Sequence, residues 1–336
     1  MKVAVLGCGS LGGVMSGRLA GDSDLELTVI DRDPRISAAI ASKGLLLRCG
    51  NKQWRRPVHV VQEAGEERFD ALILATKATS LGAAAKDFEA HLSPEAPVVT
   101  VQNGLVALDL AQVIGTQRLV PGCVLWGASM EAPGEYRITN SGPFIVGSLE
   151  DSVRPPAVNA AEELLSRIFP TTISSNIRGV LWSKLAITTT FTTLGAITGQ
   201  PFGRLSANRQ IRSLILSIGA ELYRVARAEG IRFESLGAGL DIERFLSEHG
   251  YPRLLKNLMI RIIGHKNRED ESSMLASLRQ ETKTEIEFIN GRVVEAAQRH
   301  GLEVPYNRLA VQLIHRMENG ELKPSPEHLD AFHHVA

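Results

Sequence analysis

The stretch VAVLGCGSLGG, residues 3–13, decides the fold of the first half of the chain. Its first four residues form an apolar run of strand length, and an amphipathic stretch, Leu11 to Ala20, follows. The glycines have the spacing GxGxxG: the first permits a tight turn, the second lets backbone approach a pyrophosphate, and the third lets helix pack against strand. The helix N-terminus adds N–H groups and partial positive charge for the phosphates. The sequence therefore predicts a dinucleotide-binding loop made of Gly7, Cys8, Gly9, Ser10, Leu11 and Gly12.

The residues around this loop alternate short apolar runs with amphipathic ones, which is typical of a mostly parallel sheet covered by helices on both faces. Turn signals between residues 118 and 148 predict hairpins that close the sheet. The predicted strands are residues 3–6, 27–30, 71–75 and 98–102, and the predicted helices are residues 11–20, 35–42, 81–91 and 155–168.

Beyond about Ile177 the strand signals nearly vanish, and apolar residues such as Ile211, Leu214 and Ile218 recur at helical spacing. We therefore expect an α/β N-terminal Rossmann-type dinucleotide-binding domain followed by an all-α C-terminal domain. The expected boundaries are 1–177 for the first domain, 178–323 for the second and 324–336 for a C-terminal tail.

The composition is that of an ordinary globular protein, with 336 residues, 37 Lys plus Arg, 37 Asp plus Glu and 44% apolar residues. This length favours two domains. Zero net charge gives no electrostatic reason to bind nucleic acid or an anionic membrane. Because no apolar run is long enough for a signal peptide or a membrane span, we expect a cytoplasmic protein.

The sequence also gives no signal for a metal site. Cys8, Cys49 and Cys123 are an odd number without CxxC spacing, which argues against a disulfide framework and a zinc site. His333 and His334 have no other ligands nearby in the sequence, so we interpret them as a solvated end.

The choice of dinucleotide depends on Asp31 and Arg32, which end the second predicted strand about twenty residues past Gly12. An acid here favours NAD through the ribose 2′-hydroxyl, whereas an arginine favours NADP through the 2′-phosphate. Lys77, after the third predicted strand, could add a second cation beside the same phosphate. The residues alone leave both cofactors open, together with a merely solvated strand end.

A polar stripe follows an otherwise apolar helix predicted over residues 177–197. Lys184, Thr188 and Thr192 stand at i, i+4 and i+8, on one face of such a helix. A lysine in apolar company either extends its ammonium to water or points into a cleft where the charge is needed.

Three polar residues near the C-terminal end are further candidates. Glu285 lies at the margin of an apolar helix face, where a carboxylate commonly pairs with a buried cation. Ser272 and Ser273 precede a helical run, so either is an N-cap or a contact for a substrate carboxylate.

Taken together, these residues resemble those of the ketopantoate reductase family, also called 2-dehydropantoate 2-reductase, and the resemblance covers nearly the whole chain. The segments that carry it are VAVLGCGSLGG, ILATKATS around Lys77, VQNGL around Asn103, LWSKLAI around Lys184, and SSMLASLRQETKTEIEFINGRVVEAAQRHGLEVP from Ser272 to Pro305. The resemblance implies a Rossmann domain, a helical substrate domain and an active site in the cleft between them. It also implies NADPH-dependent reduction of ketopantoate to pantoate in pantothenate biosynthesis.

The same likeness implies roles for the catalytic and substrate-side residues. Lys184 would be the general acid that protonates the carbonyl oxygen, because an ammonium stabilises the charge that builds there and supplies the proton. Glu285 would help to orient the lysine or the substrate. The substrate would be contacted by Ser273, Thr188, Thr192 and Asn103.

The likeness also implies the cofactor contacts. Arg32 and Lys77 match the pair that holds the 2′-phosphate, which favours NADP, although Asp31 would repel a phosphate unless it is turned away. Asn103 and Glu285 are the other expected cofactor contacts.

The sequence departs from the family at its substrate-side asparagines. Thr188 and Thr192 replace two of them, Phe202 aligns with a third, and Asp270 stands where another is usual; Val106 replaces a glycine. A substrate group left unpaired costs about 1–3 kcal/mol, so discrimination among 2-oxo acids would change. Ketopantoate is the first expectation; the alternatives are a different small 2-oxo acid on the same scaffold and a non-catalytic NAD(P)-binding redox sensor. A homodimer is possible.

Overall fold

The computed structural model describes residues 1–150, 154–236 and 240–335. The chain forms two compact units. The first contains Met1–Gln102 and Val106–Ile177, and the second contains Asn103–Leu105 and Arg178–Ala336. The short segment Asn103–Leu105 therefore clusters with the second unit, although it lies within the residues expected for the first domain.

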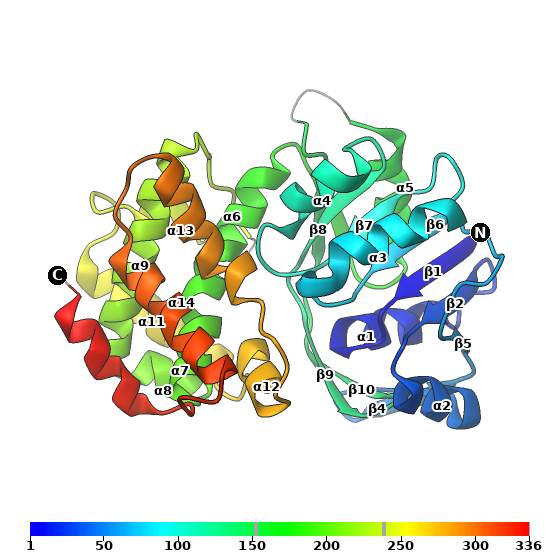
Figure 1. The fold of residues 1–336 in the computed structure, drawn as a ribbon, viewed down its shortest axis with the longest axis horizontal. Coiled ribbons are helices and arrows are strands. Elements are labelled where there is room, and N and C mark those ends of the chain that lie inside the picture. The colour runs from blue at the N-terminus through cyan, green and yellow to red at the C-terminus, as the bar shows by residue number, and fades with distance from the viewer. Residues whose placement is uncertain (151–153, 237–239, 336) are drawn as a thin grey trace. The chain divides into compact units, whose positions relative to one another are not determined.

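The first unit is built on an eight-stranded sheet with the order β12-β11-β8-β7-β6-β1-β2-β5 (Figure 1). Neighbouring strands along the run β8-β7-β6-β1-β2-β5 are parallel, whereas β11 pairs with β8 in the antiparallel sense. The strands are β1 (Lys2–Leu6), β2 (Glu26–Ile30), β5 (His59–Val61), β6 (Ala71–Leu74), β7 (Val98–Thr100), β8 (Leu119–Val124), β11 (Phe144–Gly147) and β12 (Thr171–Ser174).

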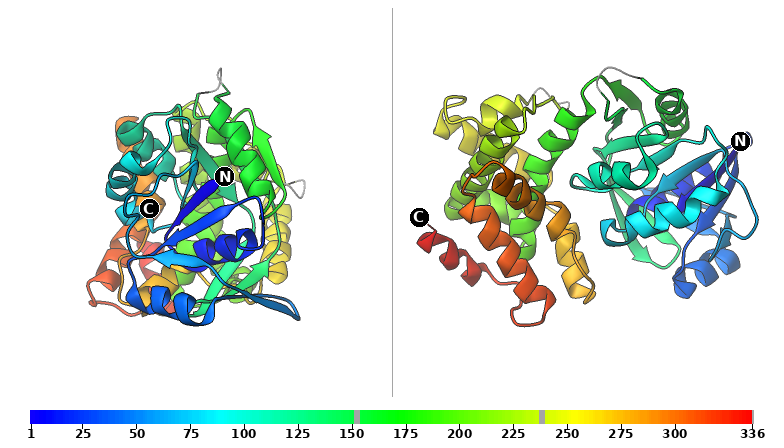
Figure 2. Two further views of the ribbon diagram at one scale, coloured as in Figure 1. Left: turned by 90° about the vertical axis from the view of Figure 1, so that its right-hand side faces the viewer. Right: turned by 45° about the horizontal axis from the view of Figure 1, so that its top comes forward.

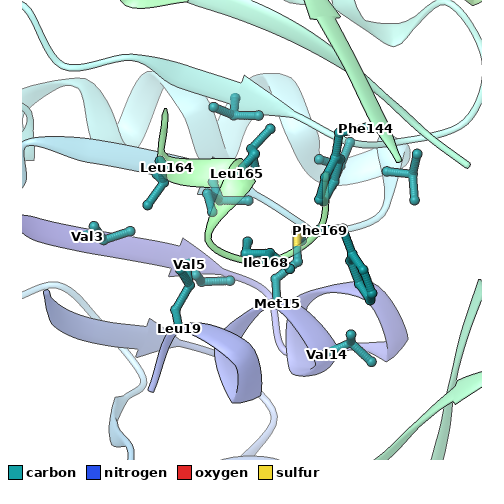
Figure 3. Packing of buried hydrophobic residues seen from close by; sticks show 14 of the residues in the cluster. Val3, Val5, Val14, Met15, Leu19, Phe144, Leu164, Leu165, Ile168 and Phe169 are labelled. Carbon is teal, nitrogen blue, oxygen red and sulfur yellow. The ribbon is translucent and has the colours of Figure 1, made fainter. Parts of the chain in front are cut away.

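Helices connect these strands, and the predicted alternation is confirmed. They are α1 (Ser10–Leu19), α2 (Pro34–Lys43), α3 (Leu81–Phe88), α4 (Val106–Ile114) and α5 (Pro156–Ser166), with 3₁₀ turns η1 (Ala78–Ser80) and η2 (Glu89–His91). Val5 of β1 belongs to the same buried cluster as Met15 and Leu19 of α1 and Leu165 of α5, part of which Figure 3 shows. This buried layer fixes the start of α1 against the end of β1.

A second sheet of four strands was not predicted. It has the order β4-β3-β10-β9, from β3 (Leu45–Cys49), β4 (Lys52–Arg56), β9 (Gly127–Ala132) and β10 (Glu135–Asn140). The prediction that all hairpins of residues 118–148 close the main sheet is therefore wrong for β9 and β10. The small sheet forms separately because it packs on α1, which presents glycines to it. A Cβ on Gly13 would stand 2.2 Å from the Tyr136 ring, and one on Gly17 would stand 2.7 Å from Leu45. These glycines let the small sheet cover α1.

The second unit, drawn from green to red in Figures 1 and 2, consists of helices in the part of the chain that the structure describes, which confirms the predicted class. They are α6 (Ile177–Ile187), the π-helical η3 (Thr188–Thr192), α7 (Thr193–Thr198), α8 (Phe202–Ala207), α9 (Arg209–Ala228), α10 (Ile242–Leu246), α11 (Arg253–Lys266), α12 (Ser273–Arg279), η4 (Ile286–Phe288), α13 (Asn290–Arg299), α14 (Pro305–Glu318) and η5 (Pro326–His334). In the described residues, every helix is too short or too polar to cross a bilayer.

The long helix expected over residues 177–197 is confirmed as a continuous helical run through α6, η3 and α7. Its middle part, η3, is π-helical, which the sequence did not predict. Consecutive threonines there direct their hydroxyls to their own helix, as Thr189 does to the Leu185 carbonyl at 2.9 Å, and such bonds bend helices. Within the residues expected to form the C-terminal tail, the 3₁₀ helix η5 (Pro326–His334) buries Leu329 and Phe332.

Candidate functional site

The turn from β1 into α1 has the geometry of a pyrophosphate site. Gly7 has φ +95°, and a Cβ there would lie 2.8 Å from the Thr76 nitrogen; a Cβ on Gly12 would lie 1.9 Å from the Gly7 carbonyl oxygen. Around Gly9, by contrast, a Cβ would meet nothing within 4 Å. Gly9 also begins α1 without a side-chain cap, so the amides of the first turn remain to bind an anion. The loop therefore fits a dinucleotide phosphate at Gly9.

The Asp31 carboxylate is turned toward this loop. One oxygen accepts a hydrogen bond from the Cys8 amide at 2.6 Å, and the other accepts one from the Asp33 amide at 2.8 Å. Both oxygens are thus used to brace the backbone at the ends of β1 and β2. Their repulsion toward a neighbouring phosphate is reduced because backbone N–H groups compensate their charge.

Tyr136 contacts the same loop through its hydroxyl, and the sequence analysis did not predict this residue. It is fully buried, and its hydroxyl donates to the Cys8 carbonyl at 2.6 Å. Burial raises the pKa of this phenol and raises the pKa of the Cys8 thiol to about 12, so both stay protonated at neutral pH. Cys8 is therefore a packing residue of the loop. The sequence signal that could have indicated Tyr136 is the alternation of Tyr136 and Ile138 with polar residues in β10.

A cavity of about 460 Å³ opens beside the loop, where residues at the carboxyl ends of β1, β2 and β6 meet. Arg32 lines it, with a largely exposed guanidinium 3.9 Å from Asp87. Lys77 is exposed just after β6. The Gln102 amide, another residue the sequence reasoning missed, donates to the carbonyls of Leu74 and Thr76 at 2.8 and 2.9 Å and so fixes this edge of the cavity.

In the second unit, Lys184 lies in the last turn of α6. It is half-buried, and Leu181 and Leu185 beside it are buried. Thr188, one turn further on, donates its hydroxyl to the carbonyls of Lys184 and Leu185 at 3.3 and 3.1 Å. Thr188 and Thr192 are 6% and 8% exposed, so both belong to the buried wall that follows the lysine.

The structure separates the two serines that the sequence left open. Ser272 is buried and is the N-cap of α12, accepting a hydrogen bond from the Leu275 amide at 3.2 Å. Its hydroxyl donates to the Thr192 carbonyl at 2.6 Å, which joins α12 to the π-helical segment. Ser273 is exposed at the first helical position. Ser272 therefore has the structural role, and Ser273 remains accessible for a ligand.

Asn103 and Glu285 come from segments that pack on each other. The Leu105 amide donates to the Phe288 carbonyl at 3.3 Å, and Gly104, with φ +84°, leaves room for that carbonyl. Glu285 immediately precedes η4, and its carbonyl accepts the Phe288 amide at 3.0 Å. The sequence-predicted asparagine and glutamate are thus attached to the same short turn.

Two of the departures from the family pattern also meet. The Phe202 amide donates to the Asp270 carbonyl at 3.0 Å. The Phe202 ring contacts Phe191 of η3 edge to face, with 5.7 Å between ring centres. This side of the π-helical segment is therefore aromatic. Within residues 1–150, 154–236 and 240–335, no three His, Cys, Asp or Glu side chains are grouped to hold a metal.

The first unit and its phosphate loop define a Rossmann-type dinucleotide-binding fold, and a helical unit follows it. The chain belongs to the ketopantoate reductase family. The family model "Ketopantoate reductase PanE/ApbA" matches residues 3–151, and its C-terminal counterpart matches residues 176–318.

Known proteins resemble the chain along nearly its full length. The 2-dehydropantoate 2-reductase of Pyrococcus abyssi is 29% identical over 314 residues, which are 94% of this chain and 97% of that protein. The crystal structure of a ketopantoate reductase from Ralstonia eutropha JMP134 superposes with a TM-score of 0.81 at 26% identity, over 96% of this chain and 99% of that one. D-mandelate dehydrogenase with NADH and anilino(oxo)acetate has the same fold, at TM-score 0.81 and 22% identity over 95% and 99% of the two chains.

Proposed function

We propose that the protein reduces a small 2-oxo acid to the 2-hydroxy acid with NADPH, and that ketopantoate is the first substrate to test. The observation that carries the proposal is the pairing of an open phosphate loop at Gly9 with a half-buried lysine, Lys184, in a chain of this family. The Pyrococcus abyssi relative bears the name of this reaction.

The chemistry assigned to this chain is proton delivery and orientation. The bound nicotinamide would supply the hydride. As the carbonyl is reduced, negative charge builds on its oxygen, and the Lys184 ammonium would stabilise that charge and donate the proton. Glu285 would orient the lysine, while Asn103 and the Ser273 hydroxyl would hold the substrate. Thr188 and Thr192 would shape the pocket for the substrate side chain.

For the cofactor, the proposal is that Arg32 and Lys77 bind the 2′-phosphate of NADPH. The hydrogen bonds that the Cys8 and Asp33 amides donate to Asp31 support it, because they occupy the carboxylate that would otherwise bind a ribose 2′-hydroxyl. Arg32→Ala should raise KM for NADPH by about 10- to 100-fold, since one charge-assisted hydrogen bond contributes about 1.5–3 kcal/mol. KM for NADH should change little. Steady-state kinetics with both cofactors measure the difference.

Arg35→Ala is the matched control for this prediction. The Arg35 guanidinium is already paired with Asp33 at 2.7 Å, so its loss should leave the preference between cofactors unchanged. Equal losses with NADPH and NADH in Arg32→Ala, or faster turnover of the wild type with NADH, would assign the cavity to NAD.

The substrate is tested with a panel of 2-oxo acids that includes ketopantoate, unbranched and branched aliphatic acids and an aromatic one. We expect NADPH oxidation that depends on the 2-oxo acid. Because Thr188, Thr192 and Phe202 replace family asparagines, acids without a hydroxyl should compete better than they do with an asparagine-lined site. Cofactor binding without turnover of any panel member would favour the redox-sensor reading instead. Homodimerisation stays a prediction, which light scattering can check.

A further inference from the structure

A hydrogen-bonded network of buried polar side chains crosses the second unit and ends at the π-helical segment. Thr193, Asn290 and Asn307 are fully buried, and Glu221 is 2% exposed. The Thr193 hydroxyl donates to the Asn290 side-chain oxygen at 2.6 Å, and the Asn290 amide donates to the Asn307 side-chain oxygen at 3.0 Å. The Asn307 amide donates in turn to the Glu221 carboxylate at 2.7 Å. Four helical elements, α7, α13, α14 and α9, are thereby joined.

Glu221 anchors one end of this network, the end farther from η3, to the backbone. Its two oxygens accept the amides of Tyr306 and Asn307, each at 2.9 Å, at the first turn of α14. These two bonds and the one from the Asn307 side chain all come from N–H donors. The side chains of Asn307 and Asn290 are therefore held in one orientation, because reversing either amide would place its oxygen against another acceptor oxygen.

At the other end of the network, Asn290 supports the π-helix itself. In η3 the hydrogen bonds run from residue i to i+5, so a carbonyl loses the partner that an α-helix would give it. The Asn290 amide donates to the Thr189 carbonyl at 3.1 Å and supplies a partner there. A buried carbonyl without a donor is costly, so this contact favours the π form over an α form of the same residues.

We propose that Asn290 is a positioning residue for Lys184, acting through the π-helical segment. This inference rests on the proposed function. Converting η3 to a regular α-helix changes the register by a residue and would turn α6 by about 100° relative to α7. Lys184 lies on α6, before η3, whereas Ser272 of α12 is bonded to Thr192 at the end of η3. The π turn therefore fixes the direction of the lysine relative to α12, which begins with Ser273.

The test compares Asn290→Leu with two milder variants. Asn290→Leu keeps the side-chain size but removes the donor to Thr189, and we expect kcat to fall at least about 10-fold with a displaced pH profile. NADPH affinity should change little, because the phosphate loop, Arg32 and Lys77 all belong to the other unit. Hydrogen exchange of the amides in residues 188–193 should become faster. Thr193→Val, which keeps the Asn290–Thr189 bond, should give a smaller change of the same kind and safeguards the test if Asn290→Leu fails to fold.

Thr198→Val is the matched control. Like Thr193→Val, it removes a buried hydroxyl from α7. The Thr198 hydroxyl donates to the Leu194 carbonyl at 2.7 Å and does not contact the π-helical segment. Its kcat, pH profile and hydrogen exchange in residues 188–193 should match the wild type. Wild-type values in folded Asn290→Leu and Thr193→Val, or equal losses in Thr198→Val, would overturn the inference. If the wild type reduces no 2-oxo acid, the proposed function fails, while hydrogen exchange still decides whether Asn290 holds the π turn.

Discussion

Lys184→Ala is expected to lower kcat by about 100- to 10,000-fold, the usual contribution of a positioned general acid. The lysine is half-buried at the end of α6, and an alanine there can neither stabilise the developing oxyanion nor supply a proton. Lys184→Arg should lose most of the activity as well, because a guanidinium keeps the charge but is too weak an acid. Steady-state kinetics with the best 2-oxo acid measure kcat, and fluorescence titration with NADPH should give an unchanged Kd.

Arg178→Ala provides the comparison on the same helix. Arg178 is an exposed cation in the first turn of α6, so its removal should leave kcat unchanged. If Lys184→Ala turned over at the wild-type rate, the general acid would have to be another group. If Lys184→Arg were fully active, the charge of this side chain would matter and its proton would not.

Two glycines of the phosphate loop, Gly9 and Gly12, should respond differently to alanine, one in cofactor affinity and the other in stability. Gly9→Ala should unfold at the wild-type temperature, because its Cβ meets nothing within 4 Å, but NADPH should bind about 10- to 100-fold more weakly. The added methyl occupies the space through which a pyrophosphate approaches the backbone. Gly12→Ala should instead lower stability by about 1–3 kcal/mol or more, because its Cβ would stand 1.9 Å from the Gly7 carbonyl oxygen.

Thermal unfolding without cofactor and titration with NADPH separate the two effects. Gly82→Ala, in α3, serves as the control, since a Cβ there also meets nothing within 4 Å and lies outside the loop. Normal NADPH affinity in Gly9→Ala would contradict the assignment of the pyrophosphate to this turn. A fully stable Gly12→Ala would contradict the packing of helix against strand.

The parts of the fold that depend on neighbouring residues could be predicted from the sequence. The step from β1 through the glycine loop to α1 follows from an apolar run, a glycine spacing and an amphipathic stretch that are adjacent in the chain. The destination of β10 could not be predicted, because it pairs with β3 across about ninety residues of sequence. Strand β4, Lys52–Arg56, was missed because its residues are mostly polar and exposed.

The candidate site divides in the same way. The glycine loop was identifiable because glycine has few substitutes at such a turn. The orientation of Asp31 was not, because it depends on which backbone amides lie within reach of its carboxylate. The π-helix also escaped prediction, since Lys184, Thr188 and Thr192 have a spacing that suits a straight helix equally well. The group that supports it, Asn290, lies about a hundred residues away in the sequence.

The most direct test of the proposed reaction follows the hydride itself. The protein is incubated with NADPH that carries deuterium in both positions at the hydride-donating carbon, together with ketopantoate and, in parallel, the best acid of the panel. Mass spectrometry of the product should show a 2-hydroxy acid with a single deuterium on carbon 2. A 2-hydroxy acid without deuterium, or no 2-hydroxy acid from any 2-oxo acid, would contradict direct reduction by NADPH.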